Sequence, residues 1–357
     1  RQGLLCFDHA GNQLWSIDQP IPQTRNGSGT SPVIAGELVF LNREERQDSY
    51  LLAVNRKSGE TVWRHEHVFP PGMSFEGYAT PIIWNDQVIL HTHSGVRAID
   101  VANGELVWQV DTNSTGCSTP VVGGSQLFVA TWNNLGEPNL RPKYPSFEAL
   151  QANDADSSGT ISFKEFPRDV VLFDRPEASD EKGVALPMRF VLGMFDANQD
   201  QDLTKEEWEA GLQRFSNQIT DHGLLAIKLG GVGNVTATHS KVLETRAIPE
   251  VPSPLYHDGR VYIVKRGGIV SCYDAETGKK LYRKRLSATG SYYASPIAVG
   301  QHIYFTSSQG KVSVIRAADV FEPLAVNDLQ ERTLATPAVA DGVIYIRTYE
   351  HLYAFGQ

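Results

Sequence analysis

The sequence is poor in cysteine and has no long apolar run. Its three cysteines, Cys6, Cys117 and Cys272, are too few and too scattered among 357 residues for a disulfide framework or a zinc site. Cys6 and Cys272 occupy matching places in two similar segments, LLCFD and VSCYD, which indicates buried apolar positions. No stretch approaches the roughly 18 apolar residues of a transmembrane helix. The sequence begins Arg-Gln-Gly, so we expect that a signal segment lies outside it.

Positive charge is also in deficit, with 32 Lys and Arg against 41 Asp and Glu. Residues 133–222 hold 17 acidic and 9 basic side chains, so the remainder is almost neutral. Neither part is basic enough to indicate binding to nucleic acid or to an anionic membrane surface. The acidity therefore belongs to one internal segment.

Two parts of that segment match the calcium loop of an EF-hand, which needs oxygen ligands at positions 1, 3, 5, 7, 9 and 12. The first loop, 154–165, supplies Asp154, Asp156, Ser158, the Thr160 carbonyl, Ser162 and Glu165. The second loop, 196–207, supplies Asp196, Asn198, Asp200, the Asp202 carbonyl, Thr204 and Glu207. Carboxylates gathered in this way repel one another unless a cation lies between them. The sequence predicts two Ca²⁺ sites; the alternative is a pair of acidic surface loops that bind nothing.

The flanks of the loops refine this prediction. Thr204 is placed to cap the helix that leaves the second loop, and Ile161 and Leu203 are placed to join the loops by a short β bridge. Gln201 stands where Gly is expected, and a left-handed conformation there costs about 1–2 kcal/mol. Pro167 comes early in the helix expected after the first loop, so we expect that helix to be short or broken.

Outside this segment the chain is repetitive. A Ser/Thr-Pro step recurs six times, at Ser31-Pro32, Thr80-Pro81, Thr119-Pro120, Ser253-Pro254, Ser295-Pro296 and Thr336-Pro337. Each step precedes alternating apolar strands, such as ELVFLN, YLLAVN and SGETVWR in the first repeat. Four short strands per unit, at a period of about forty residues, are typical of the blades of a β-propeller. The predicted fold is therefore an all-β propeller of four-stranded blades with an inserted α-helical EF-hand pair.

The repeat also predicts how the blades are divided along the chain. Residues 3–17 supply only third and fourth strands, and residues 336–355 supply only the first three. We therefore expect six or seven blades with an open seam here, and eight in the full-length protein. The acidic segment separates LFVATW (127–132) from GLLAIK (223–228), the second and third strands of one blade. The predicted parts are propeller at 1–132, inserted EF-hand pair at 133–222 and propeller at 223–357.

Three turn segments carry a family resemblance: NRKSGETVW (55–63), DVANGELVW (100–108) and DAETGKKLY (274–282). They resemble the docking repeat of the pyrroloquinoline-quinone-like β-propellers. That family includes quinoprotein alcohol dehydrogenases and a bacterial outer-membrane-assembly lipoprotein. The resemblance covers everything outside the acidic segment and implies a bacterial protein that is periplasmic or otherwise extracytoplasmic.

The interpretation that we favour is a non-catalytic scaffold or binding module with Ca²⁺ in its insertion and an unidentified protein or glycan partner. No catalytic residues are assigned. The alternative that the resemblance implies is a quinoprotein dehydrogenase with pyrroloquinoline quinone in the funnel. The chain is short for such an enzyme, and it has no adjacent Cys-Cys pair. A third possibility is a glycan or peptide binder that uses the funnel.

Residues just before the Ser/Thr-Pro steps are expected to line the central funnel: Arg25, Asn26, Tyr78, Ser118, Tyr292, Tyr293 and Arg332. Two histidine pairs, His65 with His67 and His91 with His93, are spaced so that each could hold a transition metal from one strand face. No third ligand is evident for either pair, so we favour the interpretation that they are polar residues at a strand end or at the lip of the pore.

Overall fold

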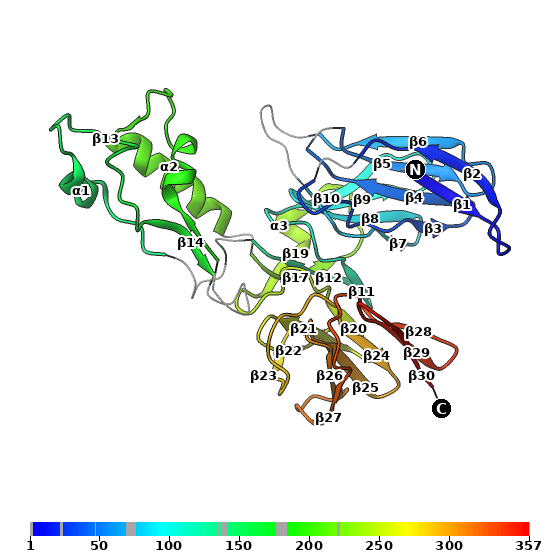
Figure 1. The fold of residues 1–357 in the computed structure, drawn as a ribbon. Helices are drawn as coiled ribbons and strands as arrows, with labels where there is room; N and C mark the ends of the chain where they lie inside the picture. Colours follow the sequence, from blue (N-terminus) through cyan, green and yellow to red (C-terminus); the bar gives the residue numbers. More distant parts are fainter. Residues whose placement is uncertain are drawn as a thin grey trace.

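The computed structural model describes residues 3–21, 24–46, 48–68, 76–133, 136, 142–175, 184–219 and 222–356. In these residues, strands outside the insertion form seven sheets (Figure 1). The first sheet pairs β1 (Gly3–Phe7) with β2 (Gln13–Asp18), and the last contains β28 (Ala338–Ala340), β29 (Val343–Arg347) and β30 (Leu352–Phe355).

Five fuller sheets lie between them along the chain, and each has antiparallel neighbours. The second contains β3 (Val33–Ala35), β4 (Leu38–Arg43), β5 (Tyr50–Asn55) and β6 (Thr61–Glu66), and the third β7 (Ile82–Trp84), β8 (Gln87–Thr92), β9 (Gly95–Asp100) and β10 (Leu106–Asp111). The fourth contains β11 (Val121–Gly123), β12 (Gln126–Thr131), β17 (Gly223–Lys228) and β19 (Ser240–Glu244). The fifth contains β20 (Leu255–His257), β21 (Arg260–Lys265), β22 (Ile269–Asp274) and β23 (Lys280–Arg285), and the sixth β24 (Ile297–Val299), β25 (His302–Thr306), β26 (Lys311–Arg316) and β27 (Pro323–Asp328). The predicted four-stranded blades are confirmed.

The third sheet departs from the four-stranded repeat. A short strand, β18 (Gly233–Asn234), pairs with β10 in parallel and adds a fifth member. The one-turn helix α3 (Thr236–His239) follows, and the Thr236 hydroxyl accepts the Asp111 backbone N–H at 2.8 Å. The connection from β17 to β19 thus packs against the neighbouring blade.

The propeller core lies between neighbouring sheets. Ile89 and Val96 of the third sheet belong to one buried cluster with Leu127 and Leu225 of the fourth. Each blade is apolar on both faces, and both faces leave water only when blades stack. Cys272 is buried in such a cluster, as predicted. Cys6 is only half-buried, because its two-stranded sheet lacks the strands that would cover it.

The Ser/Thr-Pro steps form a chain of hydrogen bonds across the blades. In each bond, the backbone N–H of one step donates to the hydroxyl of the next. The bonds are Ser31 to Thr80 (3.1 Å), Thr80 to Thr119 (3.1 Å), Thr119 to Ser253 (2.9 Å), Ser253 to Ser295 (2.9 Å) and Ser295 to Thr336 (3.0 Å). The recurrence of a hydroxyl residue therefore has a structural cause.

The ring does not close by strand pairing. Sheets β1–β2 and β28–β30 remain separate, and Figure 1 shows them apart, in dark blue and red. No hydrogen bond joins Thr336 back to Ser31 within the part of the chain that the structure describes. These findings agree with the expected open seam; eight blades in a longer protein stay a prediction.

The insertion lies between two strands that pair directly. β12 and β17 are antiparallel neighbours along their length, with Thr131 opposite Gly223. Figure 1 shows the insertion as a separate green lobe beside the ring. Its elements are α1 (Phe147–Leu150), η1 (Gln151–Asn153), β13 (Ile161–Ser162), β14 (Val171–Arg175), β15 (Val184–Pro187), η2 (Met188–Phe190), η3 (Leu192–Met194), β16 (Asp202–Leu203) and α2 (Lys205–Ile219). The division of the chain at 132 and 223 stays a prediction.

The insertion is less helical than a pair of complete EF-hands. The second loop is followed by the 15-residue helix α2. The first loop is instead followed by turns and then by the β14–β15 hairpin. Pro167 explains the missing helix, because it lacks the N–H that a helix interior needs. A core of its own supports the lobe, with Phe195 stacked on Trp208 at 5.1 Å between ring centroids.

Candidate calcium loops and funnel pocket

The two predicted calcium loops have positive φ at the same two loop positions. The fourth and sixth loop residues have positive φ in both: 60° at Ser157 and 82° at Gly159, against 63° at Gln199 and 69° at Gln201. Gln201 thus adopts the conformation for which the motif uses Gly. The strain expected at this position is present in the folded chain.

The predicted bridge and cap are confirmed. β13 pairs with β16, so Ile161 lies opposite Leu203 and the two loops are held side by side. Thr204 donates its N–H to the Glu207 carboxylate at 3.0 Å, and the Glu207 N–H donates to the Thr204 hydroxyl at 3.2 Å. This reciprocal pair begins α2.

The carboxylates of the first loop form a compact group. Asp154, Asp156 and Glu165 each place an oxygen within 4.8 Å of the others, and no other such group of three His, Cys, Asp or Glu occurs among the described residues. The Ser162 hydroxyl donates to Glu165 at 2.7 Å, and the Ala155 N–H donates at 2.9 Å. These hydrogen bonds lower the pKa of Glu165, so its charged form is favoured.

The neutral residues of the first loop lie beside this group. Ser158 donates its N–H to Asp154 at 3.1 Å, and its hydroxyl lies 3.1 Å from the Thr160 hydroxyl. Oxygen donors of this kind, carboxylate, hydroxyl and carbonyl, fit a hard cation such as Ca²⁺.

The second loop is less closely gathered. Its carboxylates do not form a group of three within 4.8 Å. Asp196 accepts loop N–H groups, the Asn198 amide donates to Asp200 at 2.8 Å, and the Thr204 hydroxyl donates to Glu207 at 2.8 Å. The ligands predicted from the sequence lie in one loop, but several are hydrogen-bonded to one another.

Asp202 couples the charges of the two loops. Desolvation raises its pKa, and the carboxylates of Asp200, Asp156 and Glu165 raise it further. Because Asp156 and Glu165 belong to the first loop, the repulsion extends across both loops. A cation in either loop would reduce that repulsion.

The residues expected to line the funnel fall into separate clusters. Tyr78 donates its hydroxyl to Glu76 at 2.5 Å and accepts from the Asn26 amide at 3.3 Å. The backbone N–H of Arg25 donates to the same carboxylate at 3.0 Å. Arg332 lies over the Tyr349 ring, 5.6 Å from its centroid, in the last sheet. These contacts hold Tyr78 and Asn26 against each other and Arg332 against Tyr349. That the seven residues line one funnel stays a prediction.

The histidine pairs have polar partners within the blades. His91 has its Nδ1 2.7 Å from the Ser118 carbonyl oxygen and its Nε2 2.7 Å from the Ser114 hydroxyl, and burial lowers its pKa to about 4. His67 Nε2 lies 2.8 Å from Asn42 Oδ1, and burial lowers its pKa to about 3. Within the described residues, neither pair gains the third His, Cys, Asp or Glu that a metal site would need.

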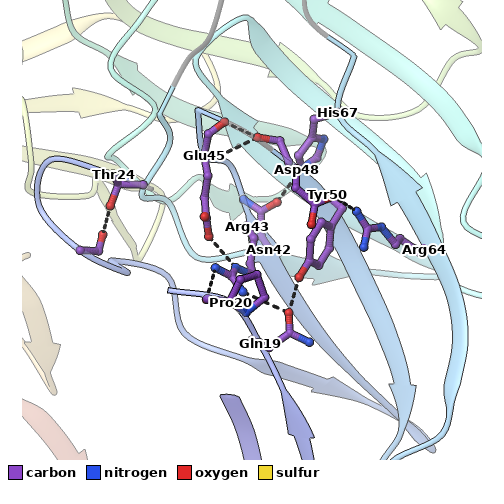
Figure 2. A network of polar contacts seen from close by, with 12 residues as sticks. Gln19, Pro20, Thr24, Asn42, Arg43, Glu45, Asp48, Tyr50, Arg64 and His67 are labelled. Atoms are coloured by element: carbon purple, nitrogen blue, oxygen red, sulfur yellow. Dashed lines mark hydrogen bonds and ion pairs between the residues drawn. The ribbon is translucent and has the colours of Figure 1, made fainter. Parts of the chain in front are cut away.

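A buried polar network ties the segment after β2 to the end of β4 (Figure 2). Arg43 donates to Glu45 at 2.5 Å, and both side chains are 6% exposed. Arg43 also donates to Gln19 Oε1 at 3.1 Å and to the Pro20 carbonyl at 2.8 Å, and the Tyr50 hydroxyl donates to Gln19. The network joins two blades. Because its charged side chains are paired with one another, it has few free donors or acceptors for a ligand.

Glu44, next in the chain, is a buried acid that forms no ion pair among the described residues. Its Oε1 accepts the His93 backbone N–H at 2.9 Å, and within the described part of the chain its Oε2 has no hydrogen-bond partner. A Cβ atom at Gly77 would lie 1.8 Å from that Oε2, so a larger residue at 77 would have to displace the Glu44 carboxylate. Burial raises the pKa of Glu44 to about 7.

One mixed pocket lies near the root of the insertion. We name it the Arg266 pocket; it is a shallow depression whose space, counted together with the open solvent in front of it, is about 360 Å³. Residues 248–252 form one wall, and Trp132, Lys265, Arg266, Tyr292 and Tyr293 form the rest. Tyr292 and Tyr293 were predicted for the funnel from the sequence. The other lining residues carry no local motif, and no sequence signal pointed to them.

The chain was compared with known proteins. A family model described as outer membrane protein assembly factor BamB matches residues 1–155 and 189–322. A curated protein of that description from Moranella endobia (strain PCIT) is 35% identical over 107 residues, which cover 27% of this chain and 26% of that protein. The chain thus matches about a quarter of that relative's length.

Two solved structures have a similar fold. BamB from Moraxella catarrhalis aligns with a TM-score of 0.54 and 13% identity, covering 98% of this chain and 77% of that chain. The computationally designed protein Ika8 aligns with a TM-score of 0.54 and 9% identity, covering 98% and 75%. At these identities the likeness concerns the fold alone, and it confirms the predicted propeller.

Proposed function

This chain belongs to the family described as outer membrane protein assembly factor BamB, and from that membership we propose that it is a non-catalytic, extracytoplasmic propeller that binds a protein partner. The observation that carries the proposal is the family match over residues 1–155 and 189–322, which covers most of the propeller and both ends of the insertion. The curated relative's own name describes an assembly factor. Among the described residues, no helix is long and apolar enough to cross a membrane.

The quinoprotein alternative needs an indole ring to stack on the cofactor and cations to hold its carboxylates. Trp132, Lys265 and Arg266 do meet in one pocket. However, Trp132 is only 4% exposed and packs edge-to-face with His222, so little of its ring can stack on a tricyclic cofactor. This geometry favours the binding function over the enzyme.

A titration with pyrroloquinoline quinone in excess Ca²⁺ tests this choice. We expect no change in cofactor absorbance and no heat of one-to-one binding. Tight one-to-one binding would make the chain a candidate dehydrogenase and overturn the proposal. Free cofactor diluted into buffer serves as the control for both signals.

We also propose that the insertion binds Ca²⁺ through the two loops. The first loop supports this most directly, since three carboxylates converge beside hydroxyl and carbonyl oxygens. The matched φ values extend the proposal to the second loop. In a compartment rich in calcium, binding would stabilise the lobe by about 2.7 kcal/mol at a hundredfold excess over Kd.

Calorimetric titration of three variants tests the calcium proposal. Glu165→Gln and Glu207→Gln should each remove one of two sites, because each loses the carboxylate at loop position 12. Glu209→Gln is the matched control, since this exposed acid lies on α2 outside the loops. Two sites remaining in either ligand variant would contradict the assignment, as would unfolding of the whole propeller in both.

A further inference from the structure

We propose that the Arg266 pocket binds a carboxylate carried by an extended, apolar peptide segment, an inference that rests on the proposed binding function. The pocket lies where the fourth, fifth and sixth sheets approach one another, beside the point at which the insertion leaves the ring. It joins a cationic side, formed by Lys265 and Arg266, to an apolar wall.

Arg266 is held in place by neutral groups. It follows β21, and it donates from one Nη to the Ser291 hydroxyl at 2.6 Å and from the other to the Tyr293 hydroxyl at 3.0 Å. Its guanidinium lies over the Tyr293 ring, 5.6 Å from the centroid. Ser291 is 3% exposed, so one of these anchors is itself buried.

No carboxylate forms an ion pair with Arg266 in the part of the chain that the structure describes. Its partners are hydroxyl groups, which orient the guanidinium without neutralising it. A guanidinium has five N–H donors in a planar fork, and two hydroxyl bonds leave donors for a ligand. The ligand that best matches a fixed fork is a carboxylate, which can accept two parallel hydrogen bonds.

The opposite wall favours an apolar neighbour of that carboxylate. Pro249 and Pro252 have no backbone N–H, so this wall has few donors. Ile248, Pro249, Pro252 and Trp132 are buried behind it, and the half-buried Val251 presents its aliphatic group to the pocket. A wall of this kind contacts aliphatic or aromatic side chains better than the hydroxyl-rich surface of a sugar.

The charges of the pocket agree with a single carboxylate. Lys265 and Arg266 supply two positive charges, and Glu250 supplies one negative charge. Burial together with the charge of Glu250 raises the pKa of the Cys117 thiol to about 11, so Glu250 also acts toward the fourth sheet. Among the described residues Arg266 has no carboxylate partner, so one bound carboxylate would balance its charge.

Three matched dipeptides test the proposal on the full chain. N-acetyl-alanyl-leucine carries a C-terminal carboxylate, N-acetyl-alanyl-leucinamide carries none, and N-acetyl-aspartyl-leucinamide carries it on a side chain. Calorimetry or NMR titration should show the free acid binding about tenfold more tightly than the amide, as expected for charge-assisted hydrogen bonds. The aspartyl peptide identifies the source: tight binding indicates side-chain carboxylates, and weak binding indicates chain termini.

Two arginine variants locate the site. Arg266→Gln should bring the free acid to the affinity of the amide. Arg260→Gln should leave the preference unchanged, because Arg260 lies in the same sheet but pairs with Asp258 and Asp319. Should Arg266→Gln fail to fold by circular dichroism, Tyr293→Phe removes one anchor of the guanidinium and should weaken binding of the acid selectively.

Equal affinity for the acid and the amide would overturn the proposal, as would a preference that survives Arg266→Gln. Absence of binding by all three dipeptides at millimolar concentration would overturn it too. None of these results bears on the quinone titration, so failure of this site and failure of the proposed non-catalytic function can be told apart.

Discussion

The backbone N–H of Thr119 donates a 2.9 Å hydrogen bond to the Ser253 hydroxyl, although 134 positions separate them in the chain. The intervening segment includes the whole insertion. The bond continues the line of bonds that runs from Ser31 to Thr336. It shows why a hydroxyl residue precedes each Pro: the hydroxyl accepts from the previous blade, while the residue's own N–H donates to the next.

Removal of that acceptor should destabilise the propeller. Ser253→Ala leaves the Thr119 N–H without a partner, which should lower the free energy of unfolding by about 1–3 kcal/mol. Guanidinium titration measures the loss. Ser253→Thr keeps the hydroxyl and should stay close to the wild type; an equal loss in both variants would show that the bond is not the cause.

Gly104 is required by the indole ring of the preceding blade. Trp63 donates its Nε1–H to the Val101 carbonyl at 2.9 Å, and a Cβ atom at Gly104 would lie 2.7 Å from its ring. Gly104 has φ of 76°, whereas Gly36 has φ of 56° with nothing within 4 Å of its added Cβ. An Ala would therefore have a strained backbone at either position, but only at Gly104 would its methyl group also clash with a neighbouring side chain.

Gly36→Ala should cost about 1 kcal/mol of stability from its backbone conformation alone. Gly104→Ala should cost about 1–3 kcal/mol more, because the new methyl group displaces the indole. Chemical denaturation of both variants measures the difference. Equal losses would mean that the docking of Trp63 tolerates a side chain at Gly104.

Glu44 should make stability depend on pH. Its pKa rises from 4.5 in the unfolded chain to about 7 in the folded one, so the folded state holds the proton more tightly between those values. Its contribution is therefore complete below about pH 4.5 and is lost as the pH rises through about 7. The loss should reach about 3 kcal/mol.

Glu44→Gln provides the comparison, since it cannot titrate. The stability of the wild type minus that of the variant should fall by about 3 kcal/mol between about pH 5 and about pH 8. His67 and His91 act in the opposite direction, because their lowered pKa values favour folding above pH 6.5. The two histidines affect the wild type and the variant equally, so their effect cancels when the two stabilities are subtracted. A stability difference that does not change with pH would show that Glu44 does not titrate in this range.

Gln201→Gly should improve the second loop. Gln201 has φ of 69°, and Gly adopts this conformation without the cost of about 1 kcal/mol. We expect calcium affinity at the second loop to rise about fivefold while the first loop is unchanged. Calorimetry on a Glu165→Gln background reports the second loop alone. Weaker binding would indicate that Gln201 makes a favourable contact that outweighs its strain.

Features written in short segments could be predicted from the sequence. The alternation of apolar residues predicted the strands, because successive side chains in a strand face opposite sides of a sheet. The spacing of ligands predicted two loops of matching conformation, and Thr204 predicted the start of α2. Pro167 predicted a short or broken helix after the first loop, where the structure has turns instead.

Features that join distant segments could not be predicted. The hydrogen bond between Arg266 and Tyr293, for example, joins residues 27 positions apart. The fifth strand, β18, pairs with β10 because the connection folds back onto a neighbouring blade. No local pattern records which blade a connection will contact.

The sequence by itself determined the blades and the positions of positive φ in the two calcium loops, because each depends on neighbours within a few residues. The tertiary structure alone decided three features: the chain of hydrogen bonds between the Ser/Thr-Pro steps, the burial of Glu44 and the Arg266 pocket. Each of these needs side chains from different blades, and stacking around a common axis sets which of them meet.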